Sequence, residues 1–169
     1  MRAPSLYWYF ASKNEIYDAM YAEGLRQLSL ALDECPTSPD PLEALKMRER
    51  LFVRLNVEDP YRYELIFQRP IPGFVPTAES FAGGAEGFAK HQRFIEAVGV
   101  RGERALDLWR AVINGLIGQQ IANAPGGDRW TRLVDEAVDI LVGHYAAAAP
   151  RSPSVKRPRG AGTRKGGKR

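Results

Sequence analysis

Apolar residues recur every three to four positions along most of the chain, the spacing that places side chains on one face of an α-helix. The first long example is the stripe Ile16, Met20, Leu25, Leu28 and Leu32. No segment alternates apolar and polar residues as a half-buried strand does, so the pattern predicts an all-α fold. The predicted helices cover, in order, about 4–10, 13–32, 41–57, 60–67, 77–98, 103–123 and 128–149.

Capping residues and prolines set the predicted helix boundaries. Ser12 and Glu15 have the spacing of a capping box. Asp40-Pro41 and Asp59-Pro60 each combine an N-cap aspartate with a proline suited to the first turn. The expected caps of two later helices are Thr77 and Asp128.

Two stretches break the regular pattern. Residues 70–76, PIPGFVP, hold three prolines and are predicted to form a loop in which Ile71 and Phe74 are the apolar side chains suited to burial. The helix at 77–98 contains glycines, each costing about 1 kcal/mol relative to alanine. These glycines are Gly83, Gly84 and Gly87. They allow the close approach of another backbone or mark a kink. The pattern leaves open whether the segment forms one helix or two.

The N-terminal residues carry a family resemblance. The pattern P-S-L-Y-W-Y-F-x-S-K-x-x-I-Y-D-A, from Pro4 onward, resembles the recognition helix and the following connector helix of TetR-type transcriptional regulators. Two segments near the C-terminus, WRAVINGLIGQQ and NAPGGDRWTRLVDEAVDILV, resemble the regulatory region of the same family. The likeness spans nearly all of 1–149. In the family, two more helices precede the recognition helix, so Met1 is expected to be an internal methionine of a longer protein.

The resemblance implies a division of the chain into four parts. Residues 1–12 are the remnant of a helix-turn-helix domain, and 13–33 are the connector helix. Residues 34–149 are the ligand-binding and dimerisation domain. The end of the chain, 150–169, is rich in Pro, Gly, Ser and Arg, and its composition predicts a disordered basic tail.

DNA contacts are implied for the first part. By resemblance, a dimer places two recognition helices in successive major grooves of a palindromic operator. Phosphate contacts are implied for Ser5, Tyr7, Tyr9 and Lys13, and the residues nearest the base edges are Ala3, Pro4, Ser5 and Trp8. The alternative from the residues alone is that this aromatic helix is core packing, with Tyr and Trp half buried.

The family also encloses a cavity for a small effector between its middle helices. The candidate lining residues are mostly aromatic, which favours a hydrophobic effector, with His91, Gln92 or Asn114 as candidate polar anchors. The alternative for each of them is ordinary core packing. The candidates are Phe52, Tyr63, Phe67, Phe74, Phe81, Phe88, His91, Trp109 and Asn114.

Homodimerisation is implied through the two C-terminal helices, which pair with their symmetry mates in the family. These helices are apolar over more than one face, and Gly115 and Gly118 would allow close approach of another helix. The alternative is that they are central helices of a monomer. The predicted interface residues are Ile113, Leu116, Ile117, Gln120, Trp130, Leu133, Val134, Val138 and Leu141.

The charge is unevenly distributed. The last twenty residues hold eight of the 24 basic residues and no acid, which leaves 16 basic against 20 acidic residues in 1–149. The folded part is therefore mildly acidic, and the sequence pI of 9.3 reflects the tail. Such a tail adds salt-dependent, non-specific DNA affinity, or it only improves solubility.

Other classes of protein are disfavoured by what the sequence contains. Neither His91 nor His144 lies in a metal-binding spacing, and the single Cys35 precedes a proline in a predicted loop. No phosphate-binding loop follows a strand, so we expect no enzyme activity, no metal and no cofactor. There is no run of about 18 apolar residues and no signal peptide pattern, which predicts a cytoplasmic protein without a membrane partner.

These observations lead to one functional hypothesis and one alternative. The hypothesis is a TetR-like DNA-binding transcriptional regulator, a repressor, controlled by a small hydrophobic effector. The alternative is a dimeric ligand-binding or interaction module that does not bind specific DNA.

Overall fold

The computed structural model describes residues 10–148, and all of the regular structure in that range is helical. This confirms the prediction of an all-α fold. The long helices agree with the predicted ranges to within about two residues, except at the start of the last one. The elements are α1 Lys13–Asp33, α2 Pro41–Glu58, α3 Pro60–Tyr63, the π-helix η2 Glu64–Gln68, α4 Ala78–Ala97, α5 Glu103–Asn123, the 3₁₀ turn η3 Thr131–Leu133 and α6 Val134–Ala148.

Four of the predicted caps act as expected. The side chains of Ser12, Asp40, Asp59 and Thr77 each accept a hydrogen bond from a backbone N–H in the first turn of the following helix. Glu15 completes the first of these caps, because its Oε2 accepts from the backbone N–H of Ala11 at 2.8 Å. These local signals are sufficient to start α1, α2, α3 and α4.

The prediction that Asp128 caps the last helix is wrong. The α-helix begins at Val134, after the single turn η3. The backbone N–H groups of Trp130 and Thr131 donate to Oε1 of Gln120, at 2.9 and 3.3 Å. A side chain from α5 takes these donors, and Asp128 contributes only its carbonyl oxygen, which accepts from Arg132 N and Thr131 Oγ1.

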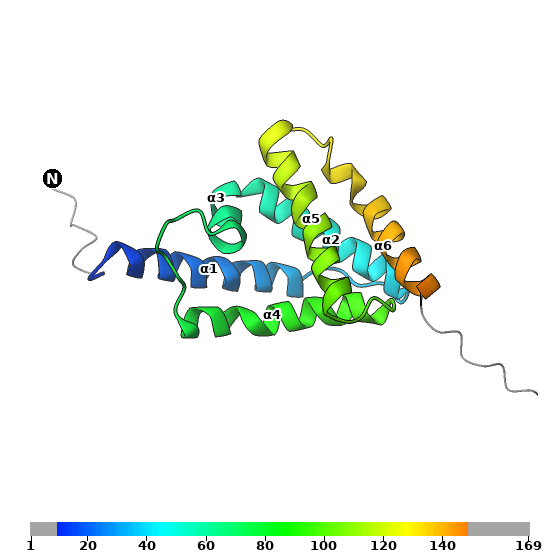
Figure 1. Ribbon diagram of the computed structural model, residues 1–169, viewed down its shortest axis with the longest axis horizontal. Coiled ribbons are helices and arrows are strands. Elements are labelled where there is room, and N and C mark those ends of the chain that lie inside the picture. Colours follow the sequence, from blue (N-terminus) through cyan, green and yellow to red (C-terminus); the bar gives the residue numbers. More distant parts are fainter. Residues whose placement is uncertain (1–9, 149–169) are drawn as a thin grey trace, which may run out of the picture.

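Helices α1 and α4 lie side by side and run in the same direction, and the segment that links η2 to α4 crosses α1 (Figure 1). α4 is one continuous helix, which answers the question left open by its glycines. Gly84 and Gly87 lie against Leu25 and Ser29 of α1, whereas a Cβ on Gly83 would meet nothing within 4 Å. Two of the three glycines therefore allow close approach of α1, and none interrupts the helix.

The adjacent glycines provide a matched pair of substitutions. Gly83→Ala is expected to stabilise the protein by about 1 kcal/mol through helix propensity. Gly84→Ala has the same gain, but its Cβ would lie 2.5 Å from Cδ1 of the buried Leu25. Overpacking of this kind costs about 1–3 kcal/mol, so Gly84→Ala should be less stable than Gly83→Ala by that amount. Urea unfolding followed by circular dichroism measures the difference, and equal stabilities would contradict the close packing.

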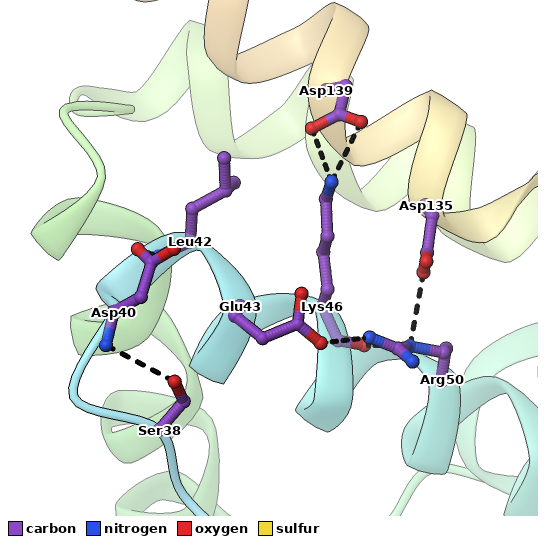
Figure 2. A network of polar contacts seen from close by, with 8 residues as sticks. All are labelled: Ser38, Asp40, Leu42, Glu43, Lys46, Arg50, Asp135 and Asp139. Carbon is purple, nitrogen blue, oxygen red and sulfur yellow. Dashed lines mark hydrogen bonds and ion pairs between the residues drawn. The ribbon is translucent and has the colours of Figure 1, made fainter.

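A polar network joins α2 to α6 (Figure 2). Lys46 Nζ lies 2.6 Å from a carboxylate oxygen of Asp139, and one helical turn further Arg50 Nε lies 3.1 Å from Asp135. Arg50 also pairs with Glu43 of its own helix. Exposed ion pairs contribute about 0–1 kcal/mol each, so this network mainly sets the antiparallel register of the two helices.

The core lies between α2, α5 and α6, with α1 and α4 packed against one side (Figure 1). Trp109, Ile113 and Ile117 of α5 are buried there together with Val134 and Val138 of α6. A second, smaller apolar cluster lies between α1, η2 and the loop before α4, and it consists of Tyr21, Leu25, Leu65, Ile66 and Phe74.

Candidate ligand-binding site

A cleft of about 520 Å³ opens beside the smaller cluster, between α1, η2, the proline-rich loop and α4. This volume is within the range of about 300–1,000 Å³ typical of small-molecule sites. Three of the predicted effector contacts, Phe67, Phe74 and Phe81, line it together. The other lining residues are Tyr21, Leu65, Ile66, Arg69, Val75, Pro76 and Ala78.

The local sequence explains the shape of this cleft. The π-helix η2 ends at Arg69, whose φ of 49° places it in the left-handed region. The prolines of 70–76 then prevent another helix, and the chain turns at Gly73, where Phe74 N donates to the carbonyl of Ile71. Phe74 is buried and packs edge to face on Tyr17 of α1, with ring centroids 5.7 Å apart. The loop is thus fixed to α1 and forms one wall of the cleft.

Asp18 connects α1 to the start of α4 next to the cleft. Its carboxylate accepts hydrogen bonds from the backbone N–H of Thr77 at 2.7 Å, from Thr77 Oγ1 at 2.9 Å and from Ser80 Oγ at 2.7 Å. The bond from Ser80 and those from Thr77 hold the pKa of Asp18 below its ordinary value of 3.8. The same aspartate therefore orders the N-terminus of α4 and fixes its position on α1.

Asp18→Ala is expected to destabilise the protein by about 1–2 kcal/mol at pH 7, as loss of a charged hydrogen-bond acceptor does. Because the native pKa is lowered, the carboxylate stabilises the fold above about pH 3.8, and this contribution falls as the pH drops toward the native value. The stability difference between the two proteins should therefore shrink below pH 4. Denaturant titrations at pH 7 and pH 3 test this, with Asp107→Ala, an exposed aspartate of α5, as the control.

Other predicted effector contacts lie in the core and not in the cleft. Trp109 Nε1 donates to Glu49 Oε1 at 2.8 Å, and His91 Nε2 lies 3.0 Å from the same oxygen. Phe52 packs beside His91, with ring centroids 5.5 Å apart. Tyr63 Oη donates to the backbone carbonyl of Asn114 at 3.2 Å. Phe52, Tyr63 and Trp109 are buried in the core, and His91 and Asn114 are half buried.

The remaining aromatic candidates are more exposed than predicted. Phe81 is 57% exposed and Phe88 is 39% exposed. Both lie on α4 at the edge of the surface that packs on α1, whose centre is occupied by Gly84 and Gly87. Phe88 reaches the rest of the protein through Phe67, with ring centroids 6.2 Å apart.

Several buried polar residues of α2 were not predicted. Glu49 and Asn56 of α2 are fully buried, and Arg48 is 4% exposed with its guanidinium over Phe94. Glu49 Oε2 and Asn56 Oδ1 have no hydrogen-bond partner within residues 10–148. The burial of Glu49 and Asn56 could have been predicted from the sequence. Both lie at helical spacing from Leu45 and Phe52 and so share the buried face of α2.

The set of predicted dimer residues needs correction. Six of the nine are buried inside the core of a single chain and offer no surface to a partner: Ile113, Ile117, Gln120, Val134, Val138 and Leu141. The other three, Leu116, Trp130 and Leu133, are half buried. Periodicity identified the apolar face of each helix correctly, but that face packs on α2 and on the other C-terminal helix.

The predicted DNA contacts fall largely outside the described residues. Only Lys13 is included, and it is exposed at the first position of α1. The contacts at Ala3, Pro4, Ser5, Tyr7, Trp8 and Tyr9 and the tail at 150–169 lie outside the range 10–148.

Other site types find no support in the part of the chain that the structure describes. Within residues 10–148, no group of three or more His, Cys, Asp or Glu side chains is arranged to hold a metal ion. None of the helices in that range is both long and apolar enough to cross a membrane. No protein-family model, curated protein or solved structure matches the chain.

Proposed function

We propose that the chain is a TetR-like DNA-binding transcriptional repressor whose DNA affinity is controlled by a small hydrophobic effector. The observation that carries this proposal is the position of α1. It begins directly after the residues that resemble a recognition helix, and its Tyr21 lines the cleft. A ligand in the cleft therefore touches the helix that leads to the DNA-reading segment.

The contacts of α1 explain how such a ligand would act. Asp18 joins α1 to the first turn of α4, and Lys90 pairs with Asp33 at the other end of the interface, at 2.9 Å. A ligand that binds better to one position of α1 on α4 shifts the population toward that position. In a dimer, this changes the spacing between the two recognition helices and thus the fit to the operator.

The proposed homodimer uses the exposed faces of α5 and α6, not the buried ones. On α5 these include Leu108, 44% exposed, and Gly115, where a Cβ would meet nothing within 4 Å. On α6 the exposed apolar residue is Ile140, 63% exposed, on the same helix face as the half-buried Ala137. Both helices thus keep apolar surface beyond what the core covers.

Ile140→Arg is expected to raise the dimer dissociation constant by about tenfold or more, because a charge would enter an apolar interface. Leu30→Arg is the matched control, since Leu30 is 52% exposed and lies on α1, which is not part of the proposed interface. Analytical ultracentrifugation of both variants over a concentration series measures the effect. A wild-type monomer, or equal dimerisation of the two variants, would contradict this interface.

The test of DNA binding is a selection of fragments from a random pool by the full chain, repeated at low and raised salt. Binding of one palindromic sequence that survives competitor DNA supports the regulator, and Lys13→Ala should weaken it. Binding that disappears when 150–169 are deleted supports only electrostatic attraction by the tail. In that case the chain is the alternative, a dimeric ligand-binding or interaction module.

A further inference from the structure

The cleft contains two polar side chains without protein partners. Tyr21 is 5% exposed, and its hydroxyl makes no hydrogen bond within residues 10–148. Burial raises the pKa of this hydroxyl, the nearby charge of Arg69 opposes the shift, and Asp18 adds to it. Tyr21 therefore keeps its proton at neutral pH and is available as a hydrogen-bond donor at the wall of the cleft.

Arg69 is the second of these groups. It follows η2 directly, lines the cleft and is exposed to solvent, and it makes no ion pair or hydrogen bond to any other residue of the described range. It is also the one residue other than glycine with a positive φ in that range. This conformation is uncommon for a residue with a Cβ, and here it belongs to the C-cap that ends η2.

Asp18 is the remaining charged group close to Tyr21, and both of its carboxylate oxygens already accept hydrogen bonds from the protein. One of its carboxylate oxygens accepts from Thr77 N and the other accepts from Thr77 Oγ1 and Ser80 Oγ. The uncommitted polar side chains of the cleft can therefore both donate a hydrogen bond, and one of them is a cation. The rest of the lining is apolar apart from backbone atoms, so a complementary ligand has an acidic group attached to an apolar body.

We propose that this cleft binds a small lipophilic carboxylate, whose carbon skeleton lies against Phe67, Phe74 and Phe81 and whose carboxylate accepts hydrogen bonds from Arg69 and Tyr21. A planar guanidinium can hold a carboxylate with two parallel hydrogen bonds, which fixes the ligand's orientation as well as its charge. Identifying this ligand as the effector rests on the proposed function, but the binding itself does not.

The experiment compares three probes with the same alkyl chain and different head groups: decanoate, decanol and decyltrimethylammonium. Isothermal titration calorimetry of the full chain, below the concentration at which the probes form micelles, gives the affinity and the number of sites. Decanoate is expected to bind at one saturable site per chain. The dissociation constant of decanoate should be lower than those of decanol and decyltrimethylammonium by about tenfold or more, as a charge-assisted hydrogen bond implies.

Two variants and one control locate the site. Arg69→Asn removes the charge while keeping a residue type that tolerates the left-handed region, and Tyr21→Phe removes only the hydroxyl. Both variants should lower the affinity for decanoate by about threefold to a hundredfold and leave the affinity for decanol unchanged. Each substitution removes only a group that contacts the carboxylate. Arg101→Asn, in the turn before α5, is the control and should bind like the wild type.

The proposal is overturned if decanol or the ammonium probe binds as tightly as decanoate. It is overturned as well if Arg69→Asn leaves the decanoate affinity unchanged. Circular dichroism of each variant verifies that it is folded before the comparison is made. If decanoate binds as expected but the chain selects no DNA sequence, then the ligand site stands and the regulator proposal fails.

Discussion

Replacing Glu49 by alanine is expected to lower the free energy of unfolding by about 2–5 kcal/mol, because it deletes a buried side chain together with its hydrogen bond. Glu49 is fully buried. Its Oε1 accepts from Trp109 Nε1 at 2.8 Å and lies 3.0 Å from His91 Nε2. Without this oxygen, the indole N–H loses its partner in the core, and the deleted side chain leaves a cavity.

Two further variants distinguish the network from the volume of the side chain. Glu49→Gln fills the same space and keeps an oxygen for Trp109, so it should cost about 1–3 kcal/mol. Glu86→Ala is the control, because Glu86 lies on α4 with its side chain 80% exposed and should change stability by less than about 0.5 kcal/mol. Guanidinium unfolding monitored by circular dichroism gives all three values. If Glu49→Ala is no less stable than Glu86→Ala, then the network does not hold α2, α4 and α5 together.

The helices were predictable from the sequence because their signals are local. Ser12, Asp40, Asp59 and Thr77 each cap the helix that follows them within a few residues, and no tertiary contact is needed to recognise this. Asp128 is also a residue type that commonly caps helices, but it does not cap α6. The backbone N–H groups nearby donate instead to Gln120. A contact across eight or more residues decides that boundary, and local patterns do not contain it.

The candidate site was predictable only in part, because periodicity shows which residues share a face but not what covers that face. On α4, Phe81 and Phe88 were predicted to line the effector cavity. The actual contact with α1 is centred on Gly84 and Gly87, where small residues let the helices approach. On α5 and α6, the apolar face was assigned to a partner chain, and the protein uses it for its own core at Ile117.

Gln120→Ala is expected to cost about 2–4 kcal/mol, because Gln120 forms a buried bridge between the end of α5 and the start of α6. Its Oε1 accepts from the backbone N–H groups of Trp130 and Thr131, while its Nε2 donates to the carbonyls of Ala124 and Gly127. Alanine would leave all four backbone groups to find other partners. The same bridge determines where α6 begins, so the loss should also loosen the segment 124–133.

Two comparisons make this prediction specific. Gln119→Ala changes the neighbouring residue, which is exposed and bonds only to the side chain of Asn123, and it should be close to neutral. Gln120→Glu keeps the acceptor for the two N–H groups but brings a carboxylate against two carbonyl oxygens, so it should destabilise more at pH 7 than at pH 4, where the side chain takes up a proton. Hydrogen exchange of Trp130 and Thr131 follows the bridge directly. If their amides exchange equally fast in Gln120→Ala and Gln119→Ala, then Gln120 does not set the start of α6.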